Sequence, residues 1–169
     1  MKFRLLLISL FICCVTTAFA QQDTVSSTRY IPVEREKHIS ILLGYNYYSR
    51  SGAEIGIGKM MERTLGHHGY TTVVYASTDV APYNKQLLWG PKIGAWTSGG
   101  CCGMSLGAAL IYYIHPEGSS LKIRPEIGFG VSRFRAFYGW ALALTNKDFW
   151  PISESMFGIT IGIKAKELK

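Results

Sequence analysis

His38 and Ser40, a histidine and a serine one residue apart, are the first residues whose types could do chemistry. A histidine activates a serine hydroxyl by accepting its proton, and a carboxylate must orient that histidine. Glu54 or Glu126 could supply the carboxylate. In a strand, alternate residues share a face, so the histidine and the serine would lie side by side. The pair is therefore a candidate hydrolase site, provided that its substrate can reach it.

Ser105 lies in a second pattern, G-x-S-x-G over residues 103–107, which is typical of serine hydrolases. That chemistry needs a sharp turn from a strand into a helix to expose the hydroxyl. Here Gly103, Ser105 and Gly107 share one face of an alternating segment, and no segment of helical period follows. The pattern favours small residues lining a strand, and no catalytic residue is predicted from it.

Neither a metal site nor a cofactor site is predicted. His67 and His68 are adjacent, so their side chains diverge, and no cysteine or carboxylate cluster accompanies them. Cys101 and Cys102 are neighbours in a glycine-rich turn, where a disulfide would be strained, and we expect free thiols.

Residues 1–20 are typical of an export signal, with basic Lys2 and Arg4, an apolar run and an Ala-Phe-Ala cleavage site before Gln21.

The elements that would position these residues alternate with a period of two. In the clearest segment, 121–132, odd positions are apolar, whereas even positions hold Lys122, Arg124, Glu126 and small residues. This pattern predicts a strand with two different environments. Eight such segments are expected, at about 38–47, 54–62, 71–78, 89–96, 104–114, 121–132, 137–144 and 157–164. Turns are expected between them at 49–52, 65–69, 79–85, 98–103, 115–120, 133–135 and 145–155.

The two faces of these segments differ in bulk. One face carries large Ile, Leu, Tyr, Trp and Phe residues, and the other carries most of the 18 glycines. So much bulk cannot fit inside eight strands, whose interior is just wide enough for side chains. We therefore predict an eight-stranded antiparallel up-and-down transmembrane β-barrel with its apolar face toward lipid, because strands cross a bilayer only as a closed sheet.

Two sets of site residues follow from this orientation. The inward charges should pair and plug the interior, so that the barrel is not an open pore; they are Glu54, Glu62, Lys92, Lys122, Arg124, Glu126 and Lys164. Aromatic residues toward the strand ends should form girdles at the two membrane interfaces; they are Tyr45, Tyr47, Trp89, Tyr112, Tyr138, Trp140 and Phe157. Pro91 and Pro125 should each mark a bulge or a strand end, because proline donates no ladder hydrogen bond.

The export signal, the eight alternating segments and the aromatic ends resemble the small outer-membrane β-barrels of the OmpA/OmpX type. The resemblance covers about residues 38–165 and is architectural. It implies periplasmic termini, a residence in the cell outer membrane, contact with its lipid, and insertion by the outer-membrane assembly machinery. The expected organisation is a signal peptide (1–20), a flexible periplasmic leader (21–37) and the barrel (38–169).

Composition limits the partners. The 169 residues carry a net charge of +7, with 17% charged and 13% aromatic residues, which argues against disorder. Export makes nucleic acid an unsuitable partner, so the basic residues suit anionic headgroups instead. A monomer with a structural or surface-interaction role is expected, and Phe149 and Trp150 in the last external loop are its candidate partner contacts.

Two other functions stay open. A soluble periplasmic carrier resembling lipocalins would need the opposite orientation, with Ile127 and Phe129 facing inward around a small apolar ligand. The His-x-Ser spacing at residues 38–40 resembles that of outer-membrane lipid A deacylases, which implies a lipid hydrolase. The sequence favours the outer-membrane barrel, which is not an enzyme, over both.

Overall fold

Nine strands account for nearly all residues that the computed structural model describes, which are 34–65, 68–100, 103–146 and 153–168. All belong to one compact unit, Pro32–Lys169. The strands are β1 (Glu34–Tyr47), β2 (Ser51–Leu65), β3 (His68–Tyr83), β4 (Gln86–Gly99), β5 (Met104–His115), β6 (Gly118–Val131), β7 (Phe134–Trp140), β8 (Leu142–Ala143) and β9 (Ser155–Glu167). None of the described residues belongs to a helix that is both long and apolar enough to cross a membrane.

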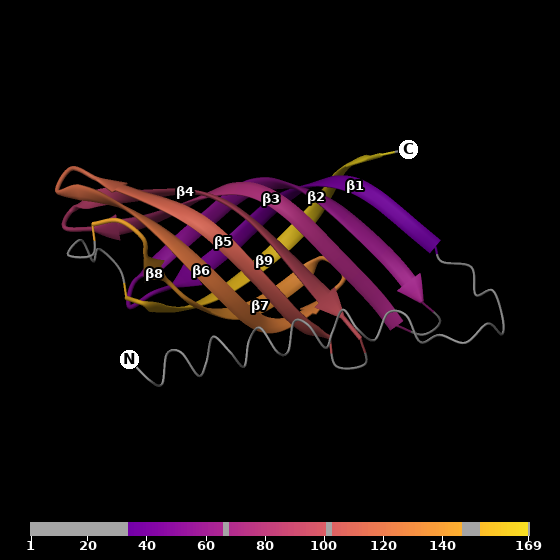
Figure 1. The fold of residues 1–169 in the computed structure, drawn as a ribbon. Coiled ribbons are helices and arrows are strands. Elements are labelled where there is room, and N and C mark those ends of the chain that lie inside the picture. The colour runs from indigo at the N-terminus through magenta and orange to yellow at the C-terminus, as the bar shows by residue number, and fades with distance from the viewer. Residues whose placement is uncertain (1–33, 66–67, 101–102, 147–152, 169) are drawn as a thin grey trace, which may run out of the picture. The chain divides into compact units, whose positions relative to one another are not determined.

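The strands form one antiparallel sheet that closes into a ring. From β1 to β7 each strand pairs with the next along the chain, β8 pairs with β6, and β9 closes the ring by pairing with both β7 and β1 (Figure 1). The prediction of an all-β, antiparallel, up-and-down fold is therefore confirmed. We call the side of the ring with the turns at 48–50, 84–85 and 116–117 the loop end, and the side where β1 begins the terminal end.

The seventh predicted strand is split into β7 and β8, which explains nine strands where eight are expected. Both pair with β6, and the pairs Glu126–Gly139 and Ile123–Leu142 flank the break. Pro125 lies in β6 within this gap and has no N–H to donate to the ladder. Ala141, at the break, donates its N–H to Glu154 O at 2.6 Å instead.

Pro91 has a related effect on the other side of the β5–β6 hairpin. The β4–β5 ladder has no pair between Trp89–Ile114 and Lys92–Ile111, yet the register is the same on both sides of this gap. The expected bulge or strand end is therefore wrong for both prolines, because β4 and β6 continue through Pro91 and Pro125 in an unchanged register and lose ladder pairs instead. The register shift that does occur lies between Ile39 and Ser40, where β1 meets β9.

Most strands extend beyond their predicted bounds, and two of the shifted boundaries matter for the interior. Strand β1 begins at Glu34, inside the expected leader, so that Glu36 lies on a strand. Strand β3 runs to Tyr83, so that most of the expected turn at 79–85 is strand and only Asn84 and Lys85 connect it to β4. Residues 34–37 are all charged, which resembles a leader, and residues 79–83 contain Asp79 and Pro82, which are common in turns. The export signal, with residues 21–33 of the leader, lies outside the described residues, as do Cys101, Cys102, Phe149 and Trp150.

The two faces of the sheet have opposite character. In β6, Ile123 and Ile127 point outward and are each 39% exposed, whereas Lys122, Arg124 and Glu126 are at most 1% exposed. Glycines on the inner face make room for large neighbours: a Cβ at Gly94 would lie 2.8 Å from the Tyr75 ring. The prediction of large apolar residues outside and small or charged residues inside matches these exposures.

Two buried apolar clusters fill the interior at different levels. One lies toward the loop end and contains Tyr48, Ala81, Leu88, Ala109, Ile111, Tyr113, Phe137 and Met156. The other lies toward the terminal end and contains Leu42, Met60, Val73, Tyr75 and Trp96. Along β2, β3 and β4, the buried charges Glu54, Asp79 and Lys92 fall between the two clusters.

Candidate functional site

Alternation along five strands brings six charged side chains together in the middle of the ring. We call this set the central network, and each member is at most 5% exposed: Glu54, Asp79, Lys92, Arg124, Glu126 and Arg135. Glu54 and Asp79 are opposite each other across the β2–β3 ladder. The network holds three cations and three carboxylates, so its formal charges balance.

Lys92 holds one half of the central network. Its Nζ lies 2.9 Å from Glu54 Oε2 and 2.7 Å from Asp79 Oδ1. Two neutral donors complete this half: Asn46 Nδ2 donates to Asp79 Oδ1 at 2.8 Å, and Ser77 Oγ donates to Glu54 Oε1 at 2.8 Å. Buried carboxylates are tolerated when they are hydrogen-bonded and faced by a cation. Here three of the four oxygens accept hydrogen bonds, and the fourth, Asp79 Oδ2, faces Arg124.

Arg124 joins that half to the other. Its Nη1 lies 3.5 Å from Asp79 Oδ2, and its Nη2 lies 2.8 Å from Glu126 Oε1. Glu126 Oε2 in turn accepts a 2.6 Å hydrogen bond from Arg135 Nη1. Arg135 also lies over the Phe137 ring, with its Cζ 4.5 Å from the ring centroid. A continuous chain of ion pairs therefore crosses the interior from β2 to β7.

The structure separates the seven predicted interior charges. It brings Glu54, Lys92, Arg124 and Glu126 into the central network. Lys122 is fully buried but lies elsewhere, with its Nζ 5.6 Å from the Tyr113 ring centroid. Glu62 and Lys164 lie toward the terminal end: Glu62 is 3.8 Å from Arg133, and Lys164 is 3.4 Å from Glu167.

Sequence reasoning missed Asp79 and Arg135, both of which it assigned to turns. The signal was available in the alternation. Asp79 has the same parity as Val73 and Tyr75, and Arg135 has the same parity as Phe137. Continuing the inner face of each segment by one or two steps would have included them.

Tyr48, directly after β1, belongs to the apolar cluster at the loop end and is 1% exposed. Burial raises the pKa of its phenol, and the nearby Asp79 carboxylate adds to the rise. The phenol is therefore neutral at physiological pH and brings no further charge to the interior.

The two serine motifs do not form a hydrolase arrangement. Ser40 Oγ donates to Met60 Sδ at 3.9 Å, and neither ring nitrogen of His38 has a hydrogen-bond partner among the described residues. Glu54 pairs with Gly44, six residues along β1 from His38, and is engaged in the central network. Ser105 is fully buried within β5 and accepts a 2.7 Å hydrogen bond from Arg135 Nε.

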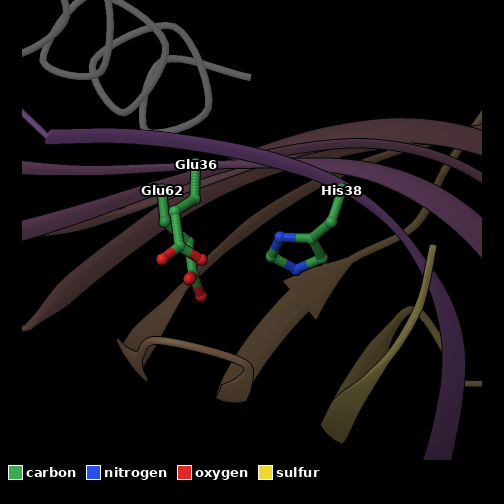
Figure 2. A group of neighbouring side chains, drawn as sticks. All are labelled: Glu36, His38 and Glu62. Atoms are coloured by element: carbon green, nitrogen blue, oxygen red, sulfur yellow. The ribbon is translucent and has the colours of Figure 1, made fainter. Parts of the chain in front are cut away.

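A second group of side chains gathers at the terminal end. We call Glu36, His38 and Glu62 the end cluster; one ligand atom from each lies within 4.8 Å of those of the other two. Glu36 and Glu62 are opposite each other across β1 and β2, and His38 is two residues along β1 on the same face. The carboxylates lie next to each other, and the imidazole ring points toward them (Figure 2).

The end cluster adjoins a cavity of about 510 Å³ at the terminal end. Glu62 lines this cavity together with Thr71, Ser98, Gly130 and Ser132. Glu62 and the cavity are therefore accessible to small solutes, unlike the central network. Sequence reasoning missed the cluster because it assigned Glu36 to the leader and could not align Glu36 with Glu62.

The predicted girdle residues all point outward, with exposures between 39% and 51%. Their positions in the ladders place all seven toward the loop end rather than at both ends. Aromatic residues that were not predicted, Tyr70, Phe129 and Phe134, point outward at the terminal end. Ten residues separate Tyr70 from Val80, which pairs with Trp89, or roughly 23 Å across a sheet tilted by about 45°.

Comparisons with known proteins give no relative from which a role could be taken: no protein-family model, no curated protein and no solved structure matches this chain.

Proposed function

We propose that this protein is an outer-membrane β-barrel with a structural or surface-interaction role, whose interior is plugged by side chains. The observation that carries the proposal is the inverted polarity of the ring. Apolar side chains such as Ile93 (60% exposed), Ile55 (57%) and Phe129 (66%) cover the outside, while ion pairs occupy the middle. A water-soluble protein rarely exposes a continuous apolar surface of this extent.

A bilayer would account for the apolar outer face and for the closure of the sheet. Hydrocarbon tolerates the large outward side chains, and a closed sheet gives the backbone groups partners where no water is present. Tyr70 and Trp89, at opposite ends of the β3–β4 pair and roughly 23 Å apart, suit the apolar band of about 25 Å expected for such barrels. Aromatic rings prefer the headgroup level on both sides of a membrane.

The central network supports a plugged interior rather than a channel. Its ion pairs cross the ring between two apolar clusters, and its members are almost fully buried. A conducting pore needs a continuous water-filled path, which such packing does not leave. We therefore propose no transport role.

The outer membrane is proposed as the location because residues 1–20 are typical of an export signal. An exported barrel with an apolar outer face belongs in the outer membrane, where it would contact lipid and be inserted by the assembly machinery. A monomer is the simplest form, since the ring closes within one chain.

The two alternatives are less well supported. A lipocalin-like carrier needs Ile127 and Phe129 inside, whereas they point outward and are 39% and 66% exposed. A lipid hydrolase needs a hydrogen-bonded histidine and serine, whereas Ser40 donates to Met60. No described feature favours either function over the membrane barrel.

Adjacent residues of β9 test the proposal. Ile161 is 49% exposed and Thr160 is 5% exposed. In a Cys101→Ser, Cys102→Ser background, I161C should react with a maleimide dissolved in the lipid but not with a membrane-impermeant one. T160C, the matched control, should react with neither until the protein unfolds. Purification as a soluble monomer without detergent, or rapid labelling of I161C from water, would overturn the proposal.

A further inference from the structure

We propose that the end cluster of Glu36, His38 and Glu62 binds one divalent transition-metal ion, with Zn²⁺ the best match. The inference does not depend on the membrane proposal, because the cluster follows from the pairing of β1 with β2. It rests on three observations: the convergence of the three side chains, the state of His38, and the loose pairing of the two carboxylates.

Convergence is dictated by the register. Glu36 is directly opposite Glu62, and His38 is opposite Met60 one step further into the ring. Inner-face parity then points all three side chains into the same space, where one ligand atom of each lies within 4.8 Å of the others. Glu36 is half exposed, so its carboxylate can move without disturbing the packed interior.

His38 provides the second, independent observation. It is fully buried, and neither Nδ1 nor Nε2 has a hydrogen-bond partner among the described residues. A buried polar atom without a partner is costly, and nearly all such atoms in proteins are paired. The ring points toward the two carboxylates (Figure 2), so a cation held by them would give one ring nitrogen its partner.

Among the described residues, no cation lies close to either carboxylate. Glu62 lies 3.8 Å from Arg133 Nε, and Glu36 lies 3.8 Å from Lys164 Nζ. Charge-assisted hydrogen bonds are about 2.7–2.9 Å long, so neither pair is a tight one. Ser132 Oγ donates to Glu62 Oε1 at 2.9 Å, which orients this carboxylate and leaves Oε2 for a ligand.

The donor set selects the ion. Zn²⁺ accepts both imidazole nitrogen and carboxylate oxygen as ligands, and three protein ligands would leave its fourth position open, whereas Mg²⁺ and Ca²⁺ prefer oxygen ligands throughout. Ligand bonds of about 2.0–2.2 Å require the three atoms to approach somewhat further, which the half-exposed Glu36 allows. The adjoining cavity gives the ion access and gives the fourth position room for water.

Titration of the folded full-length protein in detergent with ZnCl₂, followed by calorimetry, tests the site. The protein should carry no histidine tag, and in its background all four cysteines should be replaced by serine and His67 and His68 by glutamine, which removes every thiol and a second imidazole pair. We expect one ion per chain. E62Q and E36Q should each weaken binding by at least about tenfold, and H38Q should abolish it.

The loop end offers a matched control. His115 Nδ1 lies 3.8 Å from Glu117 Oε2, and this pair belongs to no cluster of three possible metal ligands among the residues that the structure describes. E117Q should leave Zn²⁺ affinity unchanged, and excess Mg²⁺ should not compete. If H38Q fails to fold, the half-exposed Glu36 still decides through E36Q. Absence of one-to-one binding, or an affinity that the combined E36Q and E62Q substitutions do not change, would overturn the proposal.

Discussion

The central network and the end cluster both place carboxylates near cations on the inner face of the ring, yet they differ in how tightly the charges are held. The tightest ion pairs of the central network are 2.6–2.9 Å long, and they join Lys92 to Glu54, Lys92 to Asp79, and Arg135 to Glu126. Those of Glu36 and Glu62 with their nearest cations are 3.8 Å long. The network lies between two apolar clusters, whereas the end cluster adjoins a cavity.

The difference between the two regions follows from how much water each set of charges has lost. Charges that have lost their water must be paired closely, because an isolated buried ion is very costly. Near a cavity, water can supply part of the solvation, so loose pairs persist and leave ligand atoms available. The closely paired charges of the central network therefore stabilise the fold, whereas the loosely paired carboxylates of the end cluster are available to bind a ligand.

The largest expected effect is the loss of one carboxylate from the central network. E126Q would leave Arg135, which is 1% exposed, without its 2.6 Å ion pair. Removing one partner of a buried pair costs about 3–5 kcal/mol, since the remaining charge stays buried. Urea unfolding of the protein in lipid vesicles, followed by tryptophan fluorescence, measures this change. A cost below about 1 kcal/mol would erase the distinction between the two regions.

Zn²⁺ should stabilise the folded protein, because it binds the end cluster only when the chain is folded. At a free Zn²⁺ concentration 100 times the dissociation constant, the free energy of unfolding should rise by about 2.7 kcal/mol. Unfolding in urea with and without Zn²⁺ measures the shift, and addition of a chelator should reverse it. An equal shift in E36Q would show that the ion acts elsewhere.

The tight middle and the open end should also respond differently to an added methyl group. At Gly94, a Cβ would lie 2.7 Å from Ala108 O and 2.8 Å from the Tyr75 ring, whereas at Gly69 nothing lies within 4 Å. G94A should cost about 1–3 kcal/mol because the ring must shift. G69A is the matched control and should stay within about 0.5 kcal/mol. Equal costs would mean that the middle is not crowded.

The smallest expected effect is the loss of a carboxylate from the end cluster in the absence of metal. E62Q removes only a 3.8 Å contact to Arg133, whose side chain is 39% exposed. Exposed pairs contribute about 0–1 kcal/mol, so unfolding should shift by no more than that. The same urea titration, run beside E126Q, gives the contrast directly.

The alternation of residue types was enough to predict the strands and the inward direction of Glu54, Lys92, Arg124 and Glu126. It failed where a polar inner face imitates a turn, at Asp79 and Arg135. It also failed where structure depends on a neighbouring strand: the break after Trp140 follows from Pro125 in β6. The meeting of Glu36 with Glu62 depends on a register that no local pattern encodes.

The two prolines have a mechanical consequence for the ring. Pro91 interrupts the ladder on one side of the β5–β6 hairpin, and Pro125 interrupts it on the other. On each side, this hairpin is therefore joined to its neighbour by a ladder from which pairs are missing. The amides along these two borders should exchange with solvent faster than those of the uninterrupted β5–β6 ladder, which hydrogen exchange measures.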